Sequence, residues 1–251
     1  MTDGLRASIV IPAYNEGDDI VPGLDRIFEA VHLDSEVLVV VDSPSDTTVP
    51  VVERYAERHP NLKVLVNDYG RGPAYAIRYG IDHATSETVV VTMADGCDDP
   101  RQIDDLVRLV ERGVVVAAAS RYMPGGQQVG GPRFKSFLSR TAGITLELFT
   151  NAGTRDATNS FKAYNAEFVR QVGINSKDGF EIGLELTAKA RRLRLPVAEI
   201  PTIWLDRAFG QSNFKLAKWL PKYFRWYRFA FGRKLTVDEL HELAAKSAPT
   251  P

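Results

Sequence analysis

The stretch Glu87-Thr-Val-Val-Val-Thr-Met-Ala-Asp-Gly-Cys-Asp-Asp-Pro100 indicates a buried strand with a polar site at its end. Its mainly apolar run, Val89–Met93, is typical of a strand that is buried on both faces of a sheet. Three carboxylates, Asp95, Asp98 and Asp99, follow the run directly. Oxygen ligands suit Mg²⁺ or Mn²⁺, which commonly lie between protein carboxylates and substrate phosphates. The stretch therefore predicts a hard-cation site, and the alternative is a strand-to-helix turn with an aspartate as helix cap.

On either side of this stretch, strand patterns alternate with helical ones. Strands are expected at 7–12, 36–41, 62–66 and 114–118, and helices at 18–31, 51–59, 74–84 and 103–111. This alternation indicates an α/β fold with a mainly parallel, doubly wound sheet flanked by helices. Ligands bind at the carboxyl ends of the strands in such sheets. Acidic and aromatic groups should therefore converge on one crevice, namely Tyr14, Glu16, Asp42, Asp46 and the Asp95 cluster.

The second half of the chain has a less regular pattern. The segment 120–132 is rich in glycine and predicts little regular structure. Helices are expected at 134–149 and 180–192, and an edge strand at 197–204 that Pro201 interrupts.

Composition limits the class of protein. The chain has 251 residues, 44% hydrophobic and 25% charged, which suits one α/β domain with a tail. A net charge of −1 argues against a nucleic-acid-binding protein. The single cysteine, Cys97, excludes an intrachain disulfide framework and is expected to be a small buried residue. We expect no signal peptide, and no apolar run approaches the roughly 18 residues that span a bilayer. The expected location is the cytoplasm, in solution or peripheral to the membrane.

A set of motifs in a fixed order gives the chain a family resemblance. The motifs are Ile9-Val-Ile-Pro-Ala-Tyr-Asn-Glu16, Ser120-Arg-Tyr with Gly125-Gly126, Ser139-Arg140, Asp156-Ala-Thr-Asn-Ser-Phe-Lys-Ala-Tyr164, Gly179-Phe-Glu181, and Asp206-Arg207 with Gly210-Gln-Ser212. In this set the chain resembles the family 2 glycosyltransferases of GT-A fold, and within them the dolichol-phosphate mannose synthase type that glycosylates polyprenyl phosphates. The resemblance implies a GT-A domain at residues 1–212 and an amphipathic helical tail at 213–251.

The resemblance also implies roles for individual residues. It places the nucleoside pocket and the base at the first two strand ends and the diphosphate near the third helix. The residues implied for the nucleotide sugar are Pro12, Ala13, Tyr14, Glu16, Asp42, Arg71, Gly72 and Asp95. Those implied for the acceptor phosphate are Arg121, Lys135, Ser139 and Arg207. Without the family resemblance, the alternative for Tyr14 is a side chain packed in the core, and the alternative for Asp42 is a helix cap.

Two positions depart from the family pattern. The usual metal motif Asp-Ala-Asp is replaced by Ala94-Asp95-Gly96, so both usual ligands are missing. Asp98 falls where the family often has a second polar group that reaches the metal, and Asp95 with Asp98 would rebuild the site for Mg²⁺ or Mn²⁺. Val41 replaces the first of two aspartates at the second strand end, which should affect nucleotide affinity rather than the chemistry.

The chemistry of the acceptor decides whether a general base is needed. A divalent ion and Arg71 would stabilise the diphosphate leaving group. A hydroxyl acceptor needs a base, for which Asp98 is the first candidate and Asp156 the second. A phosphate monoester is already ionised near neutral pH and attacks without one. It needs cations such as Arg121 to hold it, and Asp156 would then accept hydrogen bonds from sugar hydroxyls.

The tail has the pattern of a helix that lies in a membrane surface. A helical wheel over 218–233 places apolar side chains on one arc and cations on the opposite one, with only Phe229 out of place. The apolar arc holds Trp219, Leu220, Tyr223, Phe224, Trp226, Tyr227, Ala230 and Phe231, and the cations are Lys218, Lys222, Arg225, Arg228 and Arg233. The alternative is a helix packed on the protein's own core or on a partner subunit. Thr236 and Glu239 predict a capping box at a short final helix.

The function that follows is a metal-dependent, inverting glycosyltransferase that moves a hexose from a GDP- or UDP-linked sugar to a polyprenyl phosphate. The reaction is expected at the cytoplasmic face of the cell membrane, with the tail helix on the membrane surface. Two alternatives stay open: a glycosyltransferase with a sugar or other hydroxyl acceptor, and a catalytically silent homologue that keeps the nucleotide pocket. The sequence leaves the sugar, the base, the lipid and a homo-oligomeric state open.

Overall fold

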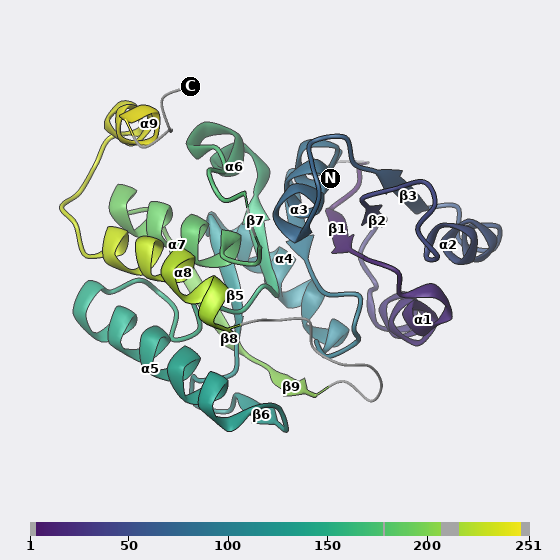
Figure 1. Ribbon diagram of the computed structural model, residues 1–251, viewed down its shortest axis with the longest axis horizontal. Coiled ribbons are helices and arrows are strands. Elements are labelled where there is room, and N and C mark those ends of the chain that lie inside the picture. The colour runs from purple at the N-terminus through teal and green to yellow at the C-terminus, as the bar shows by residue number, and fades with distance from the viewer. Residues whose placement is uncertain (1–3, 178, 207–215, 247–251) are drawn as a thin grey trace.

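A seven-stranded sheet forms the centre of the protein (Figure 1). The computed structural model describes residues 4–177, 179–206 and 216–246. The strands of the main sheet are β1 (Ala7–Pro12), β2 (Ser35–Val41), β3 (Leu62–Val66), β4 (Thr88–Val91), β5 (Val116–Ser120), β7 (Lys162–Asn165) and β8 (Val197–Pro201). Their order is β3-β2-β1-β4-β7-β5-β8, and all neighbours are parallel except β7, which runs antiparallel to β4 and β5. The predicted α/β fold with a mainly parallel sheet is confirmed.

The strand order reverses between β1 and β4. The strand that follows β1 in the chain, β2, pairs on one side of it, whereas β4 pairs on the other side. At such a reversal the connections leave in opposite directions and open a crevice at the carboxyl ends of the strands, where ligands bind. The loops after Pro12 and after Val91 both begin at this point.

Helices cover both faces of the sheet. On one face Ile9 and Ile11 of β1 pack with α1 (Val21–Ala30), α2 (Val49–Ala56) and α4 (Ile103–Glu111). On the other face Val10 packs with α3 (Pro73–Asp82), α6 (Ala166–Val172) and α7 (Ile182–Leu193). Successive strand residues point to opposite faces, so a strand covered on both sides must be apolar throughout. Burial stabilises the fold by about 1.5–3 kcal/mol for each such aliphatic side chain.

The connections in the second half contain structure that the sequence did not predict. The glycine-rich segment holds β6 (Gln127–Val129), which pairs in parallel with β9 (Ile203–Leu205) in a separate two-stranded sheet. The expected strand at 197–204 is interrupted after Pro201 and continues as β9 in this second sheet. β7 and α6 were also not predicted. These elements are short, and short segments carry too little periodicity to be distinguished from loops.

The C-terminal helices pack on the body of the protein. α8 (Leu216–Ala230) lies beside α5 (Arg133–Thr150) and α7 (Figure 1), and α9 (Val237–Lys246) packs near α6. Trp226 and Ala230 belong to a core cluster shared with α5 and α7. The predicted capping box of α9 is confirmed, because Thr236 and Glu239 exchange backbone-to-side-chain hydrogen bonds of 2.9 and 3.3 Å.

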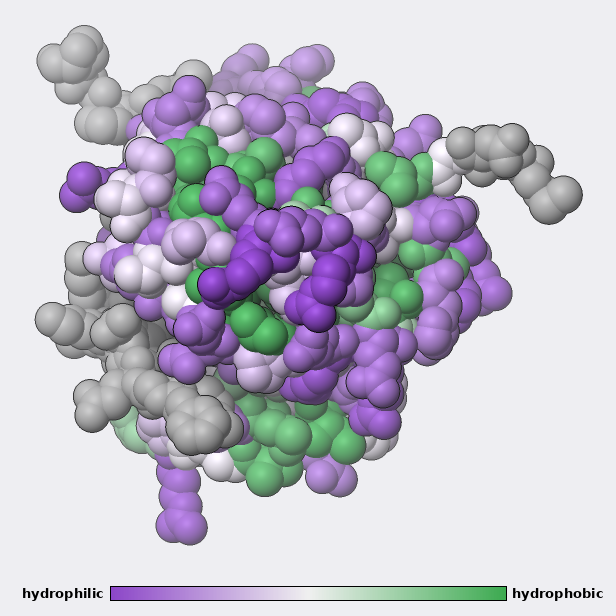
Figure 2. Space-filling model, turned by 90° about the vertical axis from the view of Figure 1, so that its right-hand side faces the viewer, coloured by the Kyte–Doolittle hydropathy of each residue, from purple (hydrophilic) through white to green (hydrophobic). Residues whose placement is uncertain are grey.

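The apolar arc predicted for the tail helix is divided in two. Trp226 and Ala230 are buried, which matches the alternative of a helix packed on its own core, whereas Leu220, Phe224 and Phe231 are exposed. None of the helices in the described residues is both long and apolar enough to cross a bilayer. Viewed from the side of α1 and α2, the surface is mainly hydrophilic, with a group of apolar side chains at its lower edge (Figure 2).

Candidate active site

The loop after β1 is held against the loop after β2. The backbone N–H of Asn15 donates to both oxygens of Asp46, at 3.1 and 3.0 Å, and that of Glu16 donates to the hydroxyl of Thr48 at 3.0 Å. Ala13 is buried, whereas the side chain of Tyr14 is 66% exposed. Core packing is therefore wrong for Tyr14, and its ring is available to a ligand at the strand ends. The structure brings the Pro12–Glu16 segment and the second strand end together, as predicted.

Asp42 joins the end of β2 to the start of α3. Its Oδ2 accepts the backbone N–H of Gly72 at 2.7 Å, and its Oδ1 accepts the side-chain N–H of Asn67. Asp42 therefore does not cap the helix that follows its own strand, because it orders the segment of Arg71 and Gly72 instead. Gly72 adopts φ +111°, a conformation that a residue with a Cβ rarely takes. Arg71 is exposed beside this helix start.

The loop after β4 separates the three predicted carboxylates. Asp99 caps the turn that begins at Pro100 and pairs with Arg101 at 2.7 Å, and this contact holds the pKa of Asp99 below its usual range. The helix-cap alternative is thus correct for Asp99. No group of three or more His, Cys, Asp or Glu side chains suited to a metal occurs within the described parts of the chain. Asp99 is therefore engaged by Arg101 and the turn, and the predicted metal ligands Asp95 and Asp98 remain.

Asp98 is buried at the end of β4. Its Oδ2 accepts the hydroxyl of Thr92 at 2.9 Å and the backbone N–H of Met93 at 3.2 Å. Burial, and then the negative charge of Asp95, raise the pKa of Asp98 to about 7 despite these hydrogen bonds. A divalent cation would relieve both effects, and one or two carboxylates with substrate phosphates are enough to hold Mg²⁺. Asp95 and Asp98 therefore fit a divalent ion.

A buried ion pair forms the other side of the crevice. The guanidinium of Arg121, which follows β5, donates to both oxygens of Asp156, at 2.7 and 2.9 Å, and the backbone N–H of Arg121 adds a third bond at 3.0 Å. The side chain of Asp156 is 0% exposed and that of Arg121 is 12% exposed. Burial opposes the charge of Arg121, but Asp156 outweighs it and keeps the pKa of Arg121 above its usual value. The charge of Asp98 acts on Arg121 as well, so the two sides are electrostatically coupled.

This ion pair corrects the predicted role of Asp156. Both of its oxygens accept hydrogen bonds from Arg121, and the carboxylate has no exposed surface. A group in this position cannot meet sugar hydroxyls or take a proton from an acceptor. Asp156 instead holds Arg121 in place.

Lys162 binds the backbone of the segment that carries Asp156. It is the first residue of β7, it is fully buried, and its ammonium donates to the backbone carbonyls of Asp156, Ala157 and Asn159. Burial lowers its pKa to about 7, against the opposing effect of Asp156. The role of this lysine was not predicted from the sequence. The available signal was a cation between the apolar residues Phe161 and Ala163.

Ser139 connects α5 to Arg121. Its hydroxyl accepts from the guanidinium at 3.3 Å and from the hydroxyl of Tyr122 at 3.1 Å, and it lies 2.6 Å from the hydroxyl of Thr158. The structure thus brings Arg121 and Ser139 together, and it adds Tyr122 and Thr158, which were not predicted. Lys135 lies one helical turn before Ser139 on α5, so both lie on the same face of the helix. Arg207 lies outside the described residues.

Comparison with known proteins shows the family. Residues 8–173, more than half of the chain, match the family described as glycosyl transferase family 2. The chain belongs to glycosyltransferase family 2. Its predicted membership is confirmed, and with it the expectation of a transferase.

Two curated relatives are similar over most of their own length. The chain is 28% identical over 215 residues to the undecaprenyl-phosphate mannosyltransferase of Micrococcus luteus, covering 83% of this chain and 87% of the relative. It is 28% identical over 233 residues to the polyprenol monophosphomannose synthase of Mycolicibacterium smegmatis, covering 85% and 86%. A solved mannosyltransferase from Pyrobaculum calidifontis, in complex with GDP-Man and Mn²⁺, matches with a TM-score of 0.56 and 20% identity over 98% of this chain and 76% of that one. This last likeness confirms the GT-A fold of the family 2 enzyme.

Proposed function

We propose that this glycosyltransferase moves a hexose from a nucleotide sugar to a polyprenyl phosphate without a general base. The observation that carries the proposal is the two-sided character of α5. One face presents Ser139 to the buried Arg121. The other sides expose large apolar residues, which are Phe134, Phe137, Ile144, Leu148 and Phe149. A phosphate held by cations next to an exposed apolar surface suits an acceptor with a long hydrocarbon chain.

The hexose that we propose is mannose, carried by GDP. The relatives are named as an undecaprenyl-phosphate mannosyltransferase and a polyprenol monophosphomannose synthase. The solved neighbour holds GDP-Man with Mn²⁺. A UDP-linked hexose is the second candidate.

The donor diphosphate would lie at the start of α3. The positive dipole end of this helix lies at Gly72, and Arg71 adds a full charge beside it. Tyr14 and Asp42 would contact the nucleoside. A Mg²⁺ or Mn²⁺ ion held by Asp95 and Asp98 would neutralise charge on the leaving diphosphate.

The acceptor would attack in a single displacement that inverts the anomeric carbon. The phosphate monoester loses its second proton with a pKa near 6, so it is nucleophilic at neutral pH. Arg121, Lys135 and Ser139 would hold it, and Asp156 and Lys162 would keep Arg121 oriented. A hydroxyl acceptor would need a base. Asp156 is not accessible for that task, and Asp98, the other candidate, would be occupied by the metal ion. This argument disfavours the hydroxyl-acceptor alternative.

The exposed apolar residues of α5 and α8 would lie on the cytoplasmic face of the membrane. Phe137 and Phe149 of α5 are 64% and 69% exposed, and Leu220 and Phe224 of α8 are 49% and 54% exposed. Exposed apolar groups of this size commonly mark a contact with a membrane or another protein. Docking there would let the acceptor phosphate reach Arg121 while its chain stays in lipid.

An acceptor panel tests this proposal. We expect wild-type protein to glycosylate a polyprenyl phosphate, and to leave the matching free polyprenol and soluble mannose unmodified. Equal use of the alcohol or the sugar would overturn the proposal in favour of a hydroxyl acceptor. Failure to hydrolyse any nucleotide sugar in the presence of metal would favour a catalytically silent homologue.

A matched pair of lysine variants tests the acceptor site. Lys135→Ala removes a charge-assisted bond worth about 1.5–3 kcal/mol, so acceptor efficiency should fall about ten- to hundredfold while the donor KM stays unchanged. Lys177→Ala removes the same charge at an exposed position outside the crevice and should leave both values unchanged. An equal loss in donor and acceptor parameters would refute the assignment of Lys135.

A further inference from the structure

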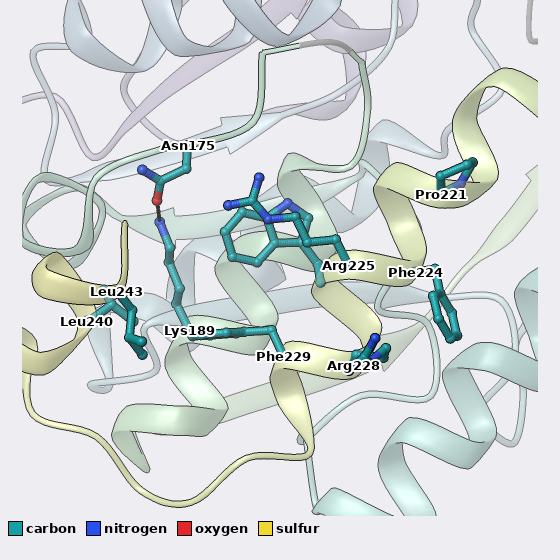
Figure 3. A pocket seen from close by; sticks show the side chains of 10 residues that line it. Asn175, Lys189, Pro221, Phe224, Arg225, Arg228, Phe229, Leu240 and Leu243 are labelled. Carbon is teal, nitrogen blue, oxygen red and sulfur yellow. Dashed lines mark hydrogen bonds between the residues drawn. The ribbon is translucent and has the colours of Figure 1, made fainter. Parts of the chain in front are cut away.

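A pocket lies between α8 and α9 (Figure 3). Its volume is about 520 Å³, within the range of about 300–1,000 Å³ that is usual for small-molecule sites. None of the donor or acceptor residues described above lines it. It is therefore separate from the crevice at the strand ends.

The walls of this pocket are largely apolar and partly open to solvent. Phe224 and Phe229 of α8 form one side, and Leu240 and Leu243 of α9 form the other (Figure 3). Phe224 is 54% exposed and Leu243 is 41% exposed. Large apolar side chains on both sides of an open pocket suit a ligand with a hydrocarbon part.

Two arginines bring positive charge to the same pocket. Arg225 and Arg228 are three residues apart on α8, both line the pocket and both are exposed. Within the described ranges neither guanidinium forms a hydrogen bond or an ion pair, and the only ring contact recorded for Arg225 is with Trp226, at 5.1 Å. Lys189 also lines the pocket, but its ammonium is buried and bound by Glu185 and Asn175 (Figure 3). The charge available to a ligand therefore comes from the two arginines.

We propose that this pocket binds an anionic phospholipid of the bilayer. Its phosphodiester group would lie between Arg225 and Arg228, because guanidinium groups match phosphate oxygens with paired hydrogen bonds. An acyl chain would lie between the phenylalanines of α8 and the leucines of α9. A free phosphate would leave the apolar walls without a partner, and a neutral lipid would leave the arginines without one. The inference rests on the proposed membrane docking but not on the sugar or the acceptor.

Charge-matched variants test the site in vesicle flotation with the full chain. Vesicles of phosphatidylcholine, with and without phosphatidylglycerol, are compared. The double variant Arg225→Gln, Arg228→Gln should bind the anionic vesicles about thirtyfold more weakly than wild type. The control Arg58→Gln, Arg112→Gln removes the same charge at exposed positions, and Arg58 also lies over a ring, that of Tyr55, at 5.4 Å. This control should bind as wild type does, and equal binding by the pocket variant would overturn the proposal.

Lysine variants separate a specific site from general attraction. Arg225→Lys, Arg228→Lys keeps the charge but loses the paired hydrogen-bond geometry. It should bind anionic vesicles more weakly than wild type. Binding equal to wild type would show a diffuse electrostatic surface and would overturn the phosphate site.

Fluorescence quenching locates the acyl chain. Trp226 lines the pocket, and the variant Trp204→Phe, Trp219→Phe leaves it as the only tryptophan. Phosphatidylglycerol with brominated chains should quench its emission, and inorganic phosphate at millimolar concentration should not compete. Quenching that phosphate abolishes would indicate a free-phosphate site and overturn the lipid assignment. Thermal unfolding of each variant at the wild-type temperature shows that the fold is kept.

The outcomes distinguish this inference from the proposed function. If wild type binds anionic vesicles and the glutamine variant binds them equally, the pocket assignment fails while membrane docking stands. If wild type glycosylates detergent-solubilised polyprenyl phosphate but binds no vesicles, docking and the pocket both fail while the transferase function stands.

Discussion

Replacing Asp156 by asparagine tests whether one buried ion pair holds the acceptor side of the crevice together. The carboxylate is 0% exposed and binds the guanidinium of Arg121 at 2.7 and 2.9 Å. Asparagine keeps the shape of the side chain but removes its charge, and it turns an N–H₂ group toward the guanidinium in place of one oxygen. Arg121 is then left buried without a compensating charge.

The expected loss in the free energy of unfolding is large. Removing one partner of a buried ion pair destabilises a protein by about 3–5 kcal/mol, whereas losing an exposed pair costs about 0–1 kcal/mol. Glu111→Gln provides the control, because Glu111 and Arg6 form a pair of equal length, 2.7 Å, with side chains that are 36% and 39% exposed. The free energy of unfolding should therefore fall much further for Asp156→Asn than for Glu111→Gln.

Urea unfolding of the two variants and the wild type measures this difference. Below the unfolding transition, acceptor KM should rise for Asp156→Asn because Arg121 no longer has a fixed orientation, while donor KM should change little. Glu111→Gln should change neither. If Asp156→Asn unfolds within about 1 kcal/mol of wild type, the pair carries no more than a surface ion pair and the reasoning is refuted.

Three further predictions concern the metal site, a packing contact and the final helix. Asp98→Asn should raise the Mg²⁺ or Mn²⁺ concentration needed for half-maximal hydrolysis of a nucleotide sugar, and an unchanged titration would contradict the assignment. Gly143→Ala should lower the melting temperature strongly, because a Cβ there would lie 1.9 Å from a backbone carbonyl oxygen. Gly23→Ala, where the nearest atom is 3.6 Å away, should leave it unchanged or raise it. The Arg233 contact, with a backbone hydrogen bond, lowers the pKa of Glu239 from 4.5 to about 2, so the cap of α9 should be fully stabilising above pH about 4.5 and be lost as the pH falls toward 2. Circular dichroism against pH should show this loss in wild type and not in Glu239→Gln.

The central strands could be predicted because their burial leaves a simple pattern. β2 and β4 are covered on both faces, so their residues had to be apolar in succession. The convergence of the first two strand ends followed from the alternation of elements, and the bonds of Asn15 and Glu16 to the loop after β2 agree with it. β7 could not be predicted in the same way, since it begins with the charged Lys162. The burial of the Lys162 ammonium depends on three backbone carbonyls that come from a neighbouring loop.

The candidate site was predicted as a set of residues but not as a set of contacts. Arg121 and Asp156 were both selected, yet they are 35 positions apart and no periodicity reports that they form a pair. Assigned separately, one became a phosphate ligand and the other a group for sugar hydroxyls. The tail helix shows a related limit, because an apolar arc has the same pattern whether protein or lipid covers it. Only the structure shows that Trp226 is covered by protein and Phe224 is not.

The altered loop after β4 bears on the choice between an enzyme and a silent homologue. Gly96 adopts φ +66°, which turns the chain so that Asp98 returns to the strand end and accepts from Met93. Arg26 fixes the turn by donating to the carbonyls of Gly96 and Asp98. The loop therefore keeps a carboxylate, that of Asp98, at the strand end although both usual ligands of the Asp-Ala-Asp motif are missing. Burying that carboxylate beside Asp95 costs free energy unless a cation is bound, and such costs are typical of functional sites. The geometry of the loop thus favours a metal-using transferase over a protein that retains only the nucleotide pocket.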